Sequence, residues 1–277
     1  MLGEQFSEIL RYRGLLGMLV WRDIRVRYKQ SLLGVAWAFL MPLINALVLY
    51  LIFTVSDMID VSDTSRLRGM PYMLFVLTGV VFWGFFAGTL TNSMDCLTRN
   101  SRLVTKIYFP REVFPLAAVA GALVDFAIAV MVVVPFYVYY ALSTPPGQIG
   151  VHPSLRLLLL PFVLLIEVVF AAGMALFLSM ANLFFRDVKY IMTFIIQMWF
   201  FATNVVYPIR FEARPHLRWI ASANPMIPIF DAYRALLMGQ PIENKIGLAL
   251  AALIAFTLFY FGWRVFHRAQ FKFAEVV

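Results

Sequence analysis

Two acidic side chains, Asp125 and Glu167, lie inside long apolar stretches of this 277-residue sequence. An ionisable group at membrane depth is costly and is by default a candidate for function. A pair of such carboxylates could relay protons in a proton-coupled secondary transporter. The same groups could instead bond neighbouring helices. We favour this structural role, because no Arg or His lies at matching depth in the apolar stretches.

Motifs for nucleotide, metal or acyl chemistry are missing from the sequence. None of its lysines follows a glycine, so no Walker A loop for ATP is present. The histidines His152, His216 and His267 fall in separate segments and form no HExxH pair. No Gly-x-Ser-x-Gly nucleophile elbow occurs either. We therefore predict no catalytic, metal or cofactor site in this chain.

One loop carries a run of carboxylates, Asp57, Asp60 and Asp63, spaced three residues apart. A membrane enzyme that acts on a lipid-linked sugar would need such a cluster at one membrane face. A D-x-x-D-x-x-D run in an outer loop is more typical of a solvated segment, and we keep the enzyme only as an alternative.

The composition indicates an integral membrane protein. Hydrophobic residues make up 62% of the chain and charged residues 14%, against about 45–50% and about 25% in soluble domains. The net charge of +8 could suggest nucleic acid, but the basic residues cluster beside apolar segments, which is a pattern of membrane orientation. The lone Cys96 cannot form an intrachain disulfide.

Six apolar stretches reach or approach the length of about 20 residues that a helix needs to cross a bilayer. They are Leu33–Val55, Pro71–Thr91, Pro115–Leu142, Leu155–Leu183, Tyr190–Tyr207 and Ile246–Trp263. The sequence therefore predicts an all-α integral membrane fold with six transmembrane helices. We expect a single domain over residues 1–277, with an interface segment (1–32), a six-span core (33–266) and a tail (267–277).

The distribution of Lys and Arg predicts the orientation of these spans. The two termini and the even-numbered loops carry 15 basic residues, and the other loops carry 8. Because basic residues favour the cytoplasmic side, we expect both termini in the cytoplasm.

Two segments outside the spans have distinct patterns. Phe6–Ile24 reads as an amphipathic helix that lies in the cytoplasmic membrane interface. Trp219–Leu237 is apolar, but prolines, Asp231 and Arg234 interrupt it. Irregular backbone at membrane depth survives only against protein or a water-filled cavity. We predict a pair of short re-entrant helices there, on the outer side before the last span; the alternative is a loop lying flat on the surface.

Aromatic residues make up 16% of the chain and concentrate within Val81–Phe86, Phe194–Phe201 and Phe256–Phe266. They are either lipid-facing bulk and interface belts or the wall of a conduit on which sugar rings could stack. The candidate channel-lining residues are Trp37, Phe82, Trp83, Phe86, Trp199 and Phe200. The Gly84-x-x-x-Gly88 spacing permits close helix contact.

Four stretches together resemble a known family. They are LVWRDIRVRYKQSLLGVAWAFLMP (19–42), NSRLVTKIYFPREVFP (100–115), NLFFRDVKY (182–190) continuing into QMWFFATNVVYP (197–208), and NPMIPIFDAYRALLMG (224–239). The chain resembles the permease subunits of ABC-2-type exporters of polysaccharides and polyol-phosphate polymers over about residues 10–265. The FPRE and FFRD stretches look closer to the O-antigen and teichoic acid branch than to the group 2 capsule branch.

The resemblance implies an assembly. The permease would be a homodimer in a bacterial cytoplasmic (inner) membrane, above a dimer of ABC ATPase subunits that bind ATP and Mg²⁺. It would export a polysaccharide attached to a lipid carrier, such as an undecaprenyl diphosphate-linked glycan. The chain itself would be a transport subunit and not an enzyme, with no nucleic-acid partner.

The resemblance also implies residue roles. A gate helix would contain Arg22, Asp23, Arg25, Arg27 and Tyr28. A coupling loop, residues 99–112, would dock on the ATPase, and Arg186 and Asp187 would form a second, smaller contact. The residues of this interface would be Arg99, Arg102, Lys106, Phe109, Pro110, Arg111, Glu112, Arg186 and Asp187. The aromatic spans would line a channel between two copies of the permease.

Overall fold

A computed structural model describes residues 11–29, 34, 36–55, 67, 69–106, 109–145, 150–208 and 223–273. All regular secondary structure in these ranges is helical. The elements are α2 (Arg13–Lys29), α3 (Ala36–Val55), α4 (Tyr72–Met94), α5 (Cys96–Arg99), α6 (Ser101–Lys106), α7 (Val113–Ser143), η2 (Leu155–Leu159), α8 (Leu160–Phe184), α9 (Val188–Ala202), α11 (Met226–Leu237), α12 (Lys245–Ala269) and η4 (Gln270–Lys272). The all-α class is thus confirmed for the described residues.

Five helical segments are long and apolar enough to cross a membrane: α3, α4, α7, α8 with the preceding turn η2, and α12. They match five of the six predicted spans. The predicted fifth span forms the 15-residue helix α9, which is about 22 Å long and falls short of a hydrocarbon core of about 30 Å. The chain is a multi-pass membrane protein, and the sixth crossing stays a prediction.

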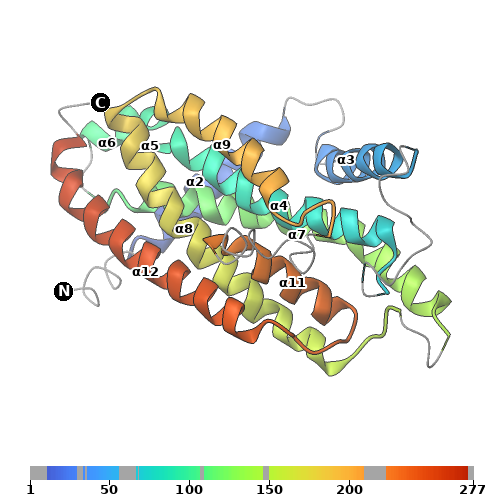
Figure 1. Cartoon of the computed structure of the whole chain (residues 1–277). Helices are drawn as coiled ribbons and strands as arrows, with labels where there is room; N and C mark the ends of the chain where they lie inside the picture. Colours follow the sequence, from blue (N-terminus) through green and yellow to red (C-terminus); the bar gives the residue numbers. More distant parts are fainter. Residues whose placement is uncertain are drawn as a thin grey trace.

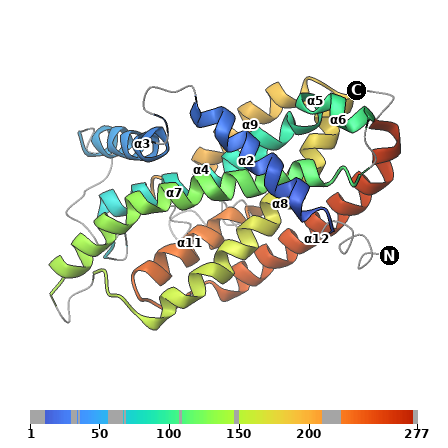
Figure 2. The ribbon, with the colours of Figure 1, turned by 180° about the vertical axis from the view of Figure 1, so that it is seen from behind.

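The bundle is organised around α4, which packs against α3, α7 and α8, while α8 runs along α12 (Figure 1). The short helices α5 and α6 lie at the same end of the bundle as the C-terminal end of α12 (Figures 1 and 2). The turn η2 and the connection between α11 and α12 lie at the opposite end. These described segments therefore lie at two opposite ends of the bundle.

Glycines allow a close contact between α8 and α12, although not at the Gly84-x-x-x-Gly88 spacing that the sequence analysis singled out. A Cβ on Gly173 of α8 would lie 2.7 Å from the backbone nitrogen of Phe259 in α12. A Cβ on Gly262 would lie 2.9 Å from the carbonyl oxygen of Gly173. Small residues of this kind allow two membrane helices to touch through their backbones. At Gly84 and Gly88 an added Cβ would meet nothing within 4 Å, so this pair makes no close helix contact.

The residues that follow α9 are not helical, yet they are buried inside the protein. Thr203 and Val205 are completely buried. A Cβ on Gly79 of α4 would lie 2.1 Å from the Val205 carbonyl oxygen, so the absence of a side chain there lets the irregular segment approach. Helix α11 follows with every residue except Asp231 buried. Residues 219–222, where the predicted re-entrant pair begins, lie outside the described part.

A second hydrophobic cluster holds the end of the bundle that carries α5 and α6. It joins Leu97 of α5, Phe114 of α7 and Phe266 of α12 with Phe273. Helix α2 lies across α7 (Figure 2) and contributes Leu19, its one buried residue, to this cluster. Helix α2 is therefore attached to the bundle by apolar packing as well as by polar contacts with α7.

Two helices present mostly uncovered apolar surface. Helix α3 buries only Ala46, and helix α9 buries only Ile196. Large exposed side chains on the two helices include Met41, Ile44, Leu47, Val48, Leu51, Tyr190, Ile191, Phe194 and Met198. Such surface requires lipid or another protein against it.

Candidate functional site

The segment that leads into the coupling loop is bonded to the corner between α8 and α9. Asp95, between α4 and α5, forms an ion pair with Lys189 of α9. The side chain of Asn182 in α8 donates a hydrogen bond of 2.9 Å to the carbonyl oxygen of Met94. These bonds join the two segments that the sequence predicts as separate ATPase contacts. The Asp95–Lys189 pair was not predicted, because the residues are far apart in the sequence.

An exposed polar surface covers this corner. The Arg99 side chain is 59% exposed and lies 3.9 Å from the Asp95 carboxylate. Arg102, Arg186 and Asp187 are also exposed, and Lys106 is the last residue of α6. We call this set the corner surface: Arg99, Arg102, Arg186 and Asp187. It carries net positive charge and could attract an acidic partner.

The second half of the coupling loop turns inward. Phe109 is buried and packs edge-on against Phe114, with ring centroids 5.3 Å apart. Glu112 is buried and hydrogen-bonds to Nδ1 of His267 in α12 at 2.7 Å. Together with the half-buried Pro110, these residues brace the loop against the end of α12. The family resemblance predicted all three residues at the ATPase interface. In the structure, Phe109 and Glu112 are buried inside the chain.

Arg111 also faces the C-terminal end of α12. Its guanidinium donates a hydrogen bond to the carbonyl oxygen of Gln270 and lies 5.9 Å from the ring centroid of Phe273. A substitution at Arg111 therefore alters an internal contact as well as surface charge, which separates it from Arg99 and Arg102.

The predicted gate residues lie on α2, and two of them contact the membrane span α7. Arg27 forms an ion pair with Asp125, and the Tyr28 hydroxyl donates a hydrogen bond of 2.8 Å to the same carboxylate. Arg22 and Asp23 pair within the helix at 2.8 Å, and Arg25 is exposed. Asp125 thus has a basic partner that the sequence did not reveal, because the partner comes from α2 and not from an apolar stretch.

The second intramembrane carboxylate has a different partner. Glu167 of α8 is completely buried and accepts a hydrogen bond of 2.7 Å from the Tyr233 hydroxyl of α11. Asp125 and Glu167 make no hydrogen bond with each other in the described structure. Each carboxylate links its span to a neighbouring helix, which is the structural role that we favoured over a proton relay.

Five of the six candidate channel aromatics lie in the core of the subunit. Trp83 is at the centre, with ring centroids 5.4 Å from Phe86, 6.4 Å from Trp199 and 5.8 Å from Phe200. Phe82 lies 3.9 Å from the Tyr233 ring. Phe82, Trp83 and Phe86 are buried within the chain, whereas Trp199 and Phe200 are partly exposed. Trp37 is 39% exposed on α3 and takes no part in this cluster.

Polar side chains bind the non-helical segment that follows the C-terminal end of α9. The sequence did not predict these hydrogen bonds. Asn224 accepts a hydrogen bond of 3.0 Å from the Trp199 ring nitrogen and donates to the Thr203 hydroxyl. Arg234 is buried, donates to the Val205 carbonyl at 2.9 Å and lies 3.4 Å from the centroid of the Phe75 ring. Of the charged residues that interrupt this apolar stretch, Arg234 thus bonds backbone inside the protein, whereas Asp231 accepts a hydrogen bond from the Asn204 side chain.

The remaining reactive group is the thiol of Cys96. Burial of Cys96 in the hydrophobic cluster raises the pKa of its thiol well above the ordinary range. Among the described residues no group of three His, Cys, Asp or Glu side chains is placed to hold a metal ion. The acidic run of Asp57, Asp60 and Asp63 lies outside the described part.

Comparison with known proteins gives one family and near full-length relatives. Residues 14–238 match the family described as ABC-2 type transporter. The O-antigen export system permease protein RfbA of Myxococcus xanthus is 28% identical over 271 residues, which is 98% of each chain. A protein of the same name from Klebsiella pneumoniae is 28% identical over 269 residues, covering 95% of each chain.

Proposed function

Because the chain belongs to the ABC-2 type transporter family, we propose that it is the permease subunit of an ATP-driven exporter that moves a lipid-linked polysaccharide across the cytoplasmic membrane. The observation that carries the proposal is the full-length similarity to permeases named for O-antigen export. The lack of a Walker A loop in the sequence requires that ATP hydrolysis belongs to a separate subunit.

The orientation follows from the two groups of loops. The end of the bundle with α5, α6 and the end of α12 carries the basic segments, so it faces the cytoplasm. Both termini then lie on that side, and η2 and the α11–α12 connection lie on the outer side. Reporter fusions at Asp187 and Gly147 test this assignment: a cytoplasmic signal at Gly147 would contradict it.

The corner surface is the docking site for the ATPase. Two short helices and the α8–α9 corner are joined by the Asp95–Lys189 pair, so force applied to one segment reaches both. The second half of the coupling loop is also bonded to α12, through Glu112 and His267. A rigid-body motion of an ATPase would therefore move α4, α7, α8 and α12 together at their cytoplasmic ends.

A second copy of the chain completes the conduit. The uncovered apolar faces of α3 and α9 are the surfaces available to a partner subunit. Trp37 and the partly exposed Trp199 and Phe200 would then face the space between the two copies. Helix α2, held by Asp125, would lie at the cytoplasmic entrance and act as its gate.

The test is binding of the ATPase to tagged permease, with ATP hydrolysis measured in lipid with and without the permease. The double variant Arg99→Glu/Arg102→Glu places like charge against an acidic partner, which costs several kcal/mol. Since about 1.4 kcal/mol is tenfold in affinity, we expect at least a tenfold loss of binding. Arg210→Glu, in the predicted outer loop, is the matched control. Full ATPase retention by the double variant would reject this docking site.

The proton-coupled alternative makes an opposite prediction. If Asp125 and Glu167 were a relay, Glu167→Gln would abolish transport and transport would follow pH. We expect ATP-driven export to persist, because both groups are engaged in separate bonds between helices.

A further inference from the structure

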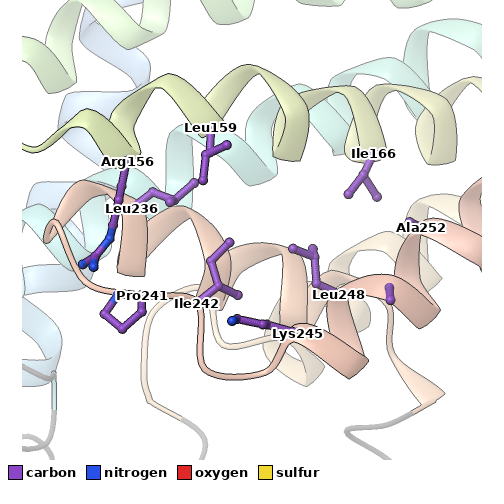
Figure 3. A pocket seen from close by; sticks show the side chains of 10 residues that line it. Arg156, Leu159, Ile166, Leu236, Pro241, Ile242, Lys245, Leu248 and Ala252 are labelled. Atoms are coloured by element: carbon purple, nitrogen blue, oxygen red, sulfur yellow. The ribbon is translucent and has the colours of Figure 1, made fainter.

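An apolar groove opens between α8, α11 and α12 at the predicted outer end of the bundle (Figure 3). Its volume is about 480 Å³. The walls are aliphatic, with Leu159, Ile166 and Leu248 among the lining residues. The only charged side chains among those that line it are Arg156 and Lys245, and both are basic.

The groove is charged toward the helix ends and apolar toward the middle of the bundle. Arg156 lies in the turn η2 and Lys245 is the first residue of α12. Figure 3 shows Ile166 and Ala252 at the opposite end of the groove from Arg156. At 1.5 Å per residue these two residues lie about 15 Å and about 10 Å deeper along their helices. The groove is therefore about as deep as one leaflet, half of a hydrocarbon core of about 30 Å.

The rim of the groove is a fixed structure. Helix α11 ends in a Schellman motif, in which Gln240 N–H donates to the Ala235 carbonyl at 2.8 Å and Gly239 N–H donates to that of Leu236 at 3.1 Å. Gly239 has a φ of +69°, and a Cβ there would lie 2.5 Å from the His152 carbonyl oxygen.

Arg156 is held at this rim because its guanidinium donates to the Gly239 carbonyl. A guanidinium carries five N–H donors, so most of them can still reach a ligand. Within the described residues no carboxylate forms an ion pair with the exposed Lys245. The two cations therefore offer charge to a group outside the chain.

We propose that this groove binds an anionic phospholipid of the outer leaflet, with one acyl chain along α8 and α12 and the phosphate between Arg156 and Lys245. An acyl chain ends within one leaflet, as the groove does, whereas the chain of a polyprenyl carrier is longer than the groove. Basic residues near the interface favour anionic over zwitterionic headgroups. The proposal concerns the lipids around the transporter and does not depend on the polymer that is exported.

The experiment is native mass spectrometry of the delipidated full-length permease with added lipids. Phosphatidylglycerol should bind at least fivefold more tightly than phosphatidylcholine with the same chains. Glycerol phosphate, which has no chain, should not bind. Lys245→Gln should weaken phosphatidylglycerol binding about fivefold, which corresponds to about 1 kcal/mol for one basic residue. Arg156→Gln should weaken it at least as much.

Matched controls separate the groove from the general surface. Arg268→Gln removes a basic residue from the opposite end of α12, where the side chain is exposed. Ala252→Phe fills the groove, and Leu253→Phe adds the same ring at a neighbouring position that is 63% exposed. We expect loss of binding only for the groove variants. Equal binding of the two phospholipids, equal effects of Lys245→Gln and Arg268→Gln, or displacement of phosphatidylglycerol by a polyprenyl phosphate would overturn the proposal.

Discussion

Asp125 ties the interface helix α2 to the span α7 by two bonds, and Asp125→Asn measures how firmly α2 is held. The Arg27 side chain is 36% exposed and that of Asp125 is 27% exposed, so we assign the ion pair the modest value of a partly exposed pair, about 1 kcal/mol or less. The Tyr28 hydroxyl adds a bond to a charged acceptor, worth about 1.5 kcal/mol. Asparagine keeps an acceptor for this hydroxyl, and we expect a net loss of about 1–2 kcal/mol in the attachment of α2.

Hydrogen–deuterium exchange of the purified permease is the suitable assay, because detachment of α2 exposes its amides without unfolding the bundle. At about 1.4 kcal/mol per tenfold, the amides at the C-terminal end of α2 should exchange about tenfold faster in the variant. The amides of α7 should keep their protection. Tyr28→Phe alone should give a smaller acceleration, and the double variant should be less than additive because Asp125→Asn weakens the same hydrogen bond that Tyr28→Phe removes.

Asp187→Asn is the control, since this carboxylate is exposed at the start of α9 and makes no side-chain contact with α2. ATP-driven export by Asp125→Asn should persist with an unchanged pH dependence. If Asp125→Asn and Asp187→Asn left α2 equally protected, the carboxylate would not hold the helix and the proposed gate would lose its attachment point.

Two substitutions and one labelling experiment test the packing of the interior. Gly79→Ala should lower the thermal midpoint strongly or prevent folding, because the new Cβ would lie 2.1 Å from the Val205 carbonyl, whereas Gly84→Ala, into open space, should not. Glu167→Ala leaves a buried tyrosine hydroxyl without its acceptor and should cost about 1–3 kcal/mol, visible in the same melting assay; Glu167→Gln should cost less. Cys96 should react slowly with maleimide in the folded permease at neutral pH and rapidly in denaturant. Because burial raises the pKa of the thiol, a modest rise in pH should not make Cys96 reactive while the protein stays folded. Fast labelling of the folded protein would contradict its burial.

The sequence predicted the spans well because their signal is local. Apolar runs of about 20 residues are set by bilayer thickness, and five of the six predicted runs coincide with helices of full length. The exception is Tyr190–Tyr207, where apolarity continues but the helix stops at Ala202. Hydropathy does not distinguish a helix from an irregular segment that is buried against protein, and Thr203 and Val205 are such a segment.

The residues of the site were less predictable because their partners are distant in the chain. Asp125 meets Arg27, and Glu112 meets His267 across 155 positions. The family resemblance placed Glu112 on the docking surface as part of the coupling loop, and a resemblance of this kind does not show which residues of the loop face inward. The hydrophobic periodicity of the sequence carries no information on such distant pairs. The exposure of Arg99 and Arg102 could be predicted, because residues in a loop between two spans usually lie at the surface.

The glycine contact between α8 and α12 decides which parts of the subunit can move. Gly173 and Gly262 touch through backbone atoms, so no side chain between them can change rotamer to absorb sliding. These two helices must travel as one piece. Flexing during a transport cycle is then confined to the seams where side chains do the packing, such as those of α2 and α3 against α7. We expect Gly173→Ala to push α8 and α12 apart, because the new methyl group would lie 2.7 Å from the backbone nitrogen of Phe259. Export should then fall before ATP hydrolysis does, because motion at the cytoplasmic end of the two helices would no longer reach their outer ends together.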